Sequence, residues 1–206
     1  MGKVQIKKKD TWIDMTPMSD VMVLLLTFFM LTSTFVKNEP VKVVTPGSVS
    51  EIKVPETDVL TLLVDKTGKI FMQVDNQHVL EAALNDMTGK FGISLDSKQA
   101  KSFVKASTFG VPMDMLSTFL SQPEEKQTEI LQTAQDVGIP TDSIDGGMSE
   151  MQAWVRAVKD ANDDIKVAIK SDGETPYKVI KTIMNELQSM NENRYYLITS
   201  YEKAEE

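Results

Sequence analysis

The sequence predicts an α+β protein: a single N-terminal transmembrane helix, then a small domain with helices packed on a mixed β-sheet, plus a helical insertion. Three observations predict this class. Residues 15–36 are almost entirely apolar, short runs within 59–74 and 165–200 are typical of strands, and residues 88–149 have the spacing of helices. The chain therefore divides into a tail (1–14), a transmembrane helix (15–36), an extended linker (37–57) and an α+β domain (58–206) that contains the insertion (88–149).

The apolar stretch carries one formal charge, Asp20, among its 22 residues. At a rise of ~1.5 Å per residue, a helix of this length reaches roughly 33 Å and covers the hydrocarbon core of a bilayer. A carboxylate inside such a segment costs about 2.5–3.5 kcal/mol on insertion scales. We therefore expect Asp20 to have a function.

A structural interpretation of Asp20 stands beside the functional one. Thr16 and Pro17 are a helix-start motif, with Thr16 predicted as N-cap and Pro17 at the first helical position. Asp20 then falls near the end of the first turn, where an acid complements the helix dipole and can reach the membrane surface.

A polar seam along the same segment favours the functional interpretation. Asp20, Thr27 and Thr34 recur every seven residues, with Leu24 and Leu31 between them on the same side. A helix places such positions in one stripe. Each threonine alone can return its hydroxyl to the backbone. Together with a carboxylate, the stripe is predicted to face protein or water and not lipid.

The distribution of charge gives the orientation and excludes a class of partner. The lysines of the tail favour a cytoplasmic N-terminus by the positive-inside rule. Taking the four lysines and three aspartates of residues 1–36 from the 22 basic and 30 acidic residues leaves 18 and 27, so the remainder is acidic and argues against nucleic acid. A cleaved signal peptide is the alternative for such an N-terminus, but the apolar run is long and no small-x-small cleavage site follows it.

The domain begins with a hairpin and ends with a strand–helix–strand unit. The predicted elements are strands at 59–64 and 69–74 around a turn, a short amphipathic helix at 79–87, a strand at 165–169, a helix at 175–190 and a strand at 194–200. Asp172-Gly173 is predicted as a turn, and His78 as a surface residue at a helix start.

The insertion is predicted to contain helices at 97–108, 111–122 and 123–137, the last stopped by Gly138. Asp142 and Asp145 lack the spacing of an EF-hand, so a loop is predicted there and not a calcium site. Packing on the domain and an extra surface for a partner both remain open for this insertion.

The linker holds Pro40, Pro46 and Pro55 together with several small residues, which favours an extended chain. Within it, Val41 to Pro46 alternates weakly in hydropathy. A solvated spacer and a contact segment for a partner are both consistent with this pattern.

The start of the apolar segment resembles the ExbD/TolR family of biopolymer transport proteins, and ExbD most closely. The residues that match the family's I-x-x-T-P-x-x-D-V-M pattern are Ile13, Thr16, Pro17, Asp20, Val21 and Met22. The order of strands and helices in residues 58–87 and 150–201 is also similar to the family's periplasmic domain, whereas residues 88–149 exceed what the family usually has there.

The resemblance implies a functional residue, a cellular location and partner proteins. Asp20 would be the protonatable residue of a proton channel, with Thr27 and Thr34 as seam companions inferred from spacing. The protein would be a single-pass inner-membrane protein, with a cytoplasmic N-terminus and a periplasmic domain. A polytopic ExbB/TolQ-type subunit, a TonB-type energy transducer and a second copy within a hetero-oligomer would be its partners. Val41, Val43 and Pro46 would form the linker's contact with a partner.

The leading hypothesis is therefore a subunit that converts proton motive force into mechanical energy for TonB-dependent outer-membrane transport. The alternatives are a TolR-like subunit for envelope maintenance and a periplasmic binding domain on a passive tether. With no cysteine and no Ser–His, paired-carboxylate or phosphate-loop signature, we expect no enzyme activity, cofactor or metal.

Overall fold

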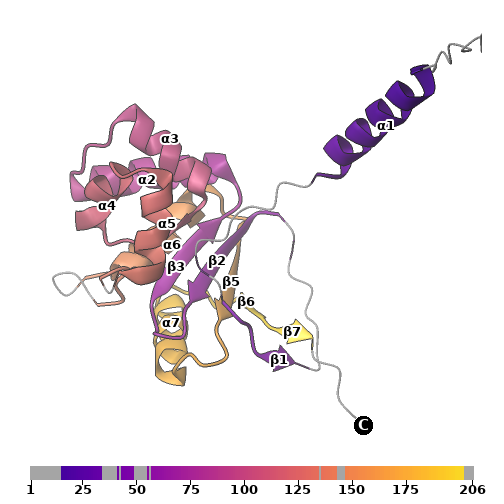
Figure 1. Cartoon of the computed structure of the whole chain (residues 1–206). Coiled ribbons are helices and arrows are strands. Elements are labelled where there is room, and N and C mark those ends of the chain that lie inside the picture. The colour runs from indigo at the N-terminus through magenta and orange to yellow at the C-terminus, as the bar shows by residue number, and fades with distance from the viewer. Residues whose placement is uncertain are drawn as a thin grey trace, which may run out of the picture. The chain divides into compact units, whose positions relative to one another are not determined.

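The computed structural model describes residues 15–33, 41, 43–48, 55, 57–134, 136–142 and 147–201. The chain divides into two units, Met1–Asn38 and Glu39–Glu206, which are described separately (Figure 1).

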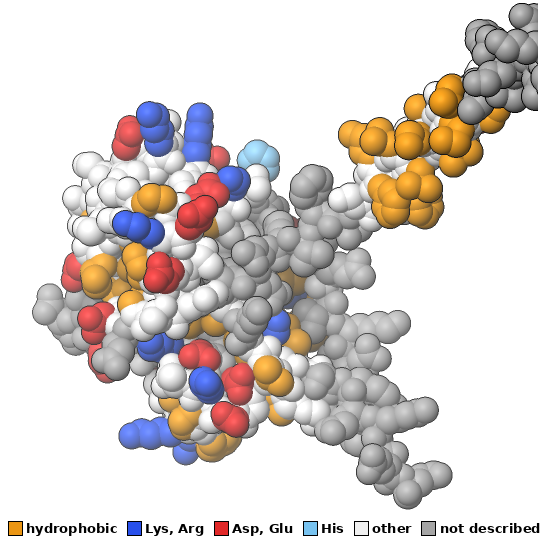
Figure 2. All heavy atoms as spheres, viewed as in Figure 1, with side chains coloured by type: hydrophobic (Ala, Val, Ile, Leu, Met, Phe, Trp, Pro, Cys, Tyr) orange, Lys and Arg blue, Asp and Glu red, His pale blue; other side chains and the backbone are white. Residues whose placement is uncertain are grey.

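The described part of the first unit, residues 15–33, forms the helix α1 (Thr16–Thr32), which is shorter than the predicted segment 15–36. Met15 is its N-cap, with helical backbone angles (φ −84°, ψ −4°) and no side-chain capping hydrogen bond of its own. The assignment of Thr16 as N-cap is therefore wrong, and Pro17 is the second helical residue, one position later than predicted. Apolar side chains cover α1 and are exposed (Figure 2). Among the described residues, no helix is both long and apolar enough to cross a bilayer, so the predicted transmembrane helix is not confirmed.

The second unit is built on a five-stranded mixed sheet with the order β4-β3-β2-β5-β6. Its strands are β2 (Val59–Val64), β3 (Ile70–Val74), β4 (Thr108–Phe109), β5 (Lys166–Ser171) and β6 (Tyr195–Ile198). β2 pairs antiparallel with β3 and parallel with β5. Because β2 is central and its sequence VLTLLV is almost continuously apolar, its side chains are buried on both faces of the sheet. The predicted hairpin and the predicted C-terminal strands are thereby confirmed.

Three helices pack together beside the sheet: α2 (Gln77–Phe91), α6 (Glu150–Ala161) and α7 (Tyr177–Ser189). α6 lies against α2 and is also hydrogen-bonded to α7, where the Gln152 side chain donates to the Glu186 carbonyl (3.2 Å). Figure 1 shows the helices of this unit gathered on one side of the sheet. The Asn76 side chain caps α2 by accepting from the backbone N–H groups of His78 and Val79. His78 is exposed, as predicted.

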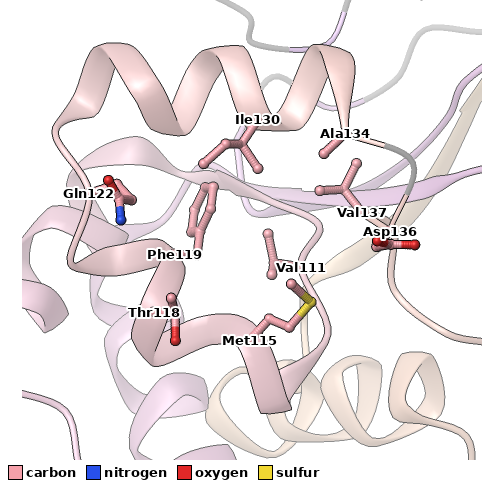
Figure 3. A pocket seen from close by; sticks show the side chains of 9 residues that line it. All are labelled: Val111, Met115, Thr118, Phe119, Gln122, Ile130, Ala134, Asp136 and Val137. Atoms are coloured by element: carbon pink, nitrogen blue, oxygen red, sulfur yellow. The ribbon is translucent and has the colours of Figure 1, made fainter.

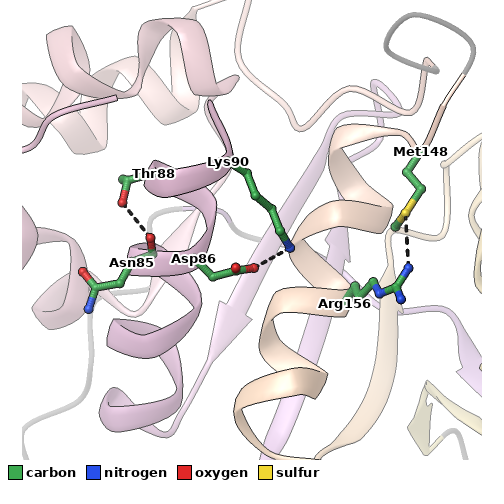
Figure 4. A network of polar contacts seen from close by, with 6 residues as sticks. All are labelled: Asn85, Asp86, Thr88, Lys90, Met148 and Arg156. Atoms are coloured by element: carbon green, nitrogen blue, oxygen red, sulfur yellow. Dashed lines mark hydrogen bonds and ion pairs between the residues drawn. The ribbon is translucent and has the colours of Figure 1, made fainter. Parts of the chain in front are cut away.

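Two polar contacts on α2 and α6 are local (Figure 4). Lys90 pairs with Asp86 one turn earlier on α2, and Arg156 on α6 donates to the Met148 sulfur (3.7 Å). Exposed pairs of this kind contribute about 0–1 kcal/mol, so they are minor contributors to the packing of the two helices.

The insertion contains α3 (Ser97–Ala106), β4, α4 (Met113–Leu120) and α5 (Glu124–Thr133). The three predicted helices are confirmed, but each is shorter than predicted. α3 ends at Ser107, which has a left-handed conformation and leads into β4, and Pro112 and Pro123 precede the other two helices.

The insertion shares the hydrophobic core of the domain. Phe103 on α3 and Phe109 on β4 pack on Trp154 of α6, with ring centroids 5.9 and 4.6 Å from the indole. β4 also extends the sheet by pairing with β3. Packing on the domain, one of the two open alternatives, is therefore what this structure shows. Sequence reasoning predicted neither β4 nor α6.

Candidate functional site

Asp20 is the only charged residue of α1, and its side chain is exposed. It is the fifth residue of the helix, and no acid lies in the first turn. The favourable effect of the helix dipole on an acid falls off within the first turn. This geometry weakens the structural interpretation of Asp20 as a dipole-complementing residue.

Thr27 lies seven residues after Asp20, on the same side of α1, about 10 Å further along the helix axis. Its hydroxyl donates to the carbonyl of Leu24 (2.9 Å), and Thr32 donates to Phe28 in the same way (2.8 Å). These hydroxyl protons are used within the helix, so Thr27 offers an acceptor oxygen and no free donor. Thr34, the third predicted seam residue, lies outside the described residues.

The linker contacts the domain at Val41 and at residues 43–48. Val41 is buried, whereas Pro46 is exposed. The backbone N–H of Val44 donates to the Asp172 carboxylate (3.0 Å), and the N–H of Gly173 donates to the Val44 carbonyl (2.9 Å). The linker next forms β1 (Gly47–Ser48), which pairs in parallel with β7 (Ser200–Tyr201). This stretch is therefore attached to the domain, while Val44, Pro46 and Gly47 remain exposed.

Asp172 is a positioning residue that sequence reasoning treated only as part of a turn. Its carboxylate accepts from the backbone N–H of Glu174 (3.0 Å) as well as from Val44. These two donors, Glu174 first, lower the pKa of Asp172 below its usual value. The ionised carboxylate thus holds the linker against the end of β5.

Two further carboxylates lie where the insertion rejoins the domain. Glu150, the first residue of α6, is buried and accepts from the backbone N–H of Met113 at the start of α4 (3.0 Å). Burial raises the pKa of Glu150 from 4.5 to about 7; the Met113 N–H opposes this rise, and the charge of Asp114 adds to it. A raised pKa at Glu186 on α7 also results mainly from burial, against a hydrogen bond from the Ser149 hydroxyl (2.7 Å).

The sequence contains a motif that marks the start of α6 and therefore the position of Glu150. Ser149-Glu150-Met151-Gln152 has the S-x-x-Q spacing of a capping box, and both of its hydrogen bonds form at the start of α6. Their chemistry is structural: Glu150 satisfies an N–H at the start of α4, and Glu186 joins α7 to α6 through Ser149. Within the described parts of the chain, no group of three or more His, Asp or Glu side chains is placed to hold a metal ion.

The arrangement thus separates two kinds of acid. Asp172, Glu150 and Glu186 are held by hydrogen bonds inside the domain, whereas Asp20 stands alone on an apolar helix.

Comparison with known proteins agrees with the sequence motif. The family model for the biopolymer transport protein ExbD/TolR matches residues 7–202, a range that includes α1, the linker, the insertion and the whole sheet. Searches of curated proteins and of solved structures found no match. Because the match extends over nearly the whole chain, the protein belongs to the ExbD/TolR family of biopolymer transport proteins.

Proposed function

We propose that this protein is the subunit of an inner-membrane proton-channel complex that converts proton motive force into mechanical energy, with Asp20 as its protonatable carboxylate. The observation that carries the proposal is the isolation of Asp20 as the one charge on the exposed apolar surface of α1. Membership in a family of biopolymer transport proteins supports it.

The physical basis is the cost of a charge in apolar surroundings. A carboxylate taken out of water is strongly disfavoured unless it is paired or neutralised, so a proton delivered to Asp20 changes how favourably α1 sits against a partner. Two charge states that bind differently to two arrangements of a complex shift the balance between them. Repeated protonation and release then drive motion.

One helix with one acid does not form a conduit, so the proposal includes partners. A polytopic ExbB/TolQ-type subunit supplies the remainder of the proton path, and a second copy of this chain completes the pair of helices. A TonB-type protein receives the force. Pro46 is exposed and, with the exposed Val44 and the half-buried Val43, forms the accessible part of the predicted contact segment. The role is non-enzymatic.

The test is Asp20→Asn, which removes the ionisable group and keeps the size of the side chain. We expect uptake that depends on proton motive force to fall to background, while the variant still inserts in the membrane and copurifies with its polytopic partner. Uptake is measured as transport of a labelled substrate into cells with and without an uncoupler.

Ser19→Asn is the matched control, because it places the same amide one position earlier on α1. It should leave uptake near the wild-type level. Near-normal uptake in an assembled Asp20→Asn complex would contradict the proposal and favour the passive tether. Loss of envelope integrity with normal uptake would instead assign the protein to the TolR-like branch.

A further inference from the structure

An apolar pocket opens between α4 and α5 of the insertion (Figure 3). Its wall is formed by side chains from both helices and from the segments beside them: Val111, Met115, Phe119, Ile130, Ala134 and Val137. Val111 and Val137 are buried at its base, Ile130 and Ala134 are half-buried, and Met115 is 48% exposed. The pocket therefore presents apolar surface to the outside.

The size of the pocket limits what it can hold. Its volume is about 160 Å³. Pockets for small-molecule ligands usually measure roughly 300–1,000 Å³, whereas an apolar cavity of about 150 Å³ holds a group of the size of benzene. The pocket fits one large apolar side chain and is too small for a cofactor.

The charge around the pocket limits the class of partner. The described residues from 111 to 142 contain six acidic side chains and one basic side chain, Lys126. Two lysines from outside this stretch also reach it: Lys69 donates to the Ala134 carbonyl and Lys105 pairs with Glu124. Six acids against three bases leave the surface negative. Asp136 lines the pocket and Asp114 precedes Met115; both are exposed. Nucleic acid, anionic lipid and a second copy of the same acidic surface are all repelled by this field. A basic polypeptide segment is attracted to it.

We propose that the pocket between α4 and α5 is the docking site for a partner protein's basic segment, which inserts one large apolar side chain between flanking Lys or Arg residues. Burial of the apolar side chain in the pocket stabilises the complex, and the flanking Lys or Arg residues form ion pairs with Asp114 and Asp136. The site belongs to the insertion and requires neither Asp20 nor α1. It is therefore independent of the proposed proton function.

The test uses the full chain in mild detergent with labelled methionine methyl groups and observes them by NMR. The probes are nonapeptides Gly-Lys-Ser-Lys-X-Lys-Ser-Lys-Gly, with Leu, Phe or Met at the central position X. We expect at least one of them to shift the Met115 methyl signal saturably. Met148, which is 36% exposed and outside the pocket wall, is the internal reference and should not move.

Matched probes and variants separate the two parts of the proposal. A central Ala, or Glu in place of every Lys, should weaken binding at least tenfold. Thr118→Trp fills the pocket from its exposed rim and should abolish the shift. Asp136→Lys should weaken binding severalfold, whereas the same change at the exposed Asp163, outside the insertion, should leave it unchanged.

Several results would overturn the inference. One is no saturable Met115 shift with any of the three apolar centres. A second is binding of the Ala-centred or Glu-substituted peptide that equals binding of the Lys-flanked apolar peptides. A third is binding that persists in the Thr118→Trp variant. A Met115 signal that moves with protein concentration alone would identify a second copy as the occupant, and would equally overturn it.

Discussion

Glu150 is a buried acid that satisfies a backbone N–H at the start of a helix in another part of the domain. Because burial raises its folded-state pKa from 4.5 to about 7, the folded protein retains a proton that the unfolded chain has already lost across this interval. The contribution of Glu150 to stability is therefore fully present at or below pH 4.5 and is lost as the pH rises towards 7.

Glu150→Gln should reduce this pH dependence, because the amide keeps an acceptor for the Met113 N–H and does not ionise. Between the unfolded-state and folded-state pKa values of Glu150, the free energy of unfolding changes by ~1.4 kcal/mol per pH unit. From pH 5 to pH 8 the free energy of unfolding should therefore fall by about 1–3 kcal/mol more in the wild type than in the variant. Urea unfolding of the full chain at each pH, followed by circular dichroism, measures the difference. Parallel pH profiles for the two proteins would contradict it.

The other titrating acids define the background of that measurement. Glu186 has a raised pKa and acts in the same direction as Glu150. Asp172 has a lowered pKa, so its contribution is present above its usual pKa and is lost as the pH falls through the lower folded value. The interval from pH 5 to pH 8 therefore reports mainly on the two glutamates.

At the scale of elements, the turn from β4 to α4 depends on a close approach between backbone and ring. A Cβ on Gly110 would lie 2.1 Å from the nearest ring carbon of Phe71, which is 1% exposed on β3. Phe71 cannot move into solvent without opening the core. The absence of a side chain at position 110 therefore permits β4 to reach the edge of the sheet.

Gly110→Ala should destabilise the domain by about 1–3 kcal/mol, the usual cost of overpacking a core. Gly89→Ala makes the same change inside α2, where an added Cβ meets nothing within 4 Å. That variant should stabilise the protein by about 0.5–1 kcal/mol through helix propensity. Thermal unfolding compares the two, and a similar shift of both midpoints would refute the packing argument.

At the scale of the molecule, the insertion is part of the domain's folding unit. Phe103, Phe109 and Trp154 form one aromatic cluster across α3, β4 and α6. In addition, the Lys69 ammonium donates to the Ala134 carbonyl at the end of α5 (2.6 Å). These contacts connect the insertion to the hairpin of β2 and β3 as well as to the helices.

Phe103→Ala should therefore weaken the whole domain, by about 3–5 kcal/mol for a fully buried aromatic side chain. Hydrogen exchange should speed up in β2 and β5 as well as in α3 and α4. Leu197→Ala, at a 45% exposed position on β6, is the control and should have little effect. Faster exchange confined to residues 97–133 would show an insertion that opens on its own.

Local pattern predicted much of this fold, whereas the role of Asp20 stays a prediction. The strands of the hairpin and α7 follow from β-branched runs, a turn and helical spacing, and Asp20 from its setting in an apolar segment. Asp172 and Glu150 were missed because their partners lie 128 and 37 residues away in the chain. β4 was missed since two residues carry no periodicity, and its pairing with β3 defines it.

Trp154 also makes the docking of the insertion observable by optical spectroscopy. Its indole is 1% exposed and stacks on Phe103. An indole in such dry surroundings emits at shorter wavelength than one in water. With Trp12 replaced by Phe, Trp154 is the sole remaining tryptophan. The wavelength of its emission maximum then reports whether the insertion is packed on the domain.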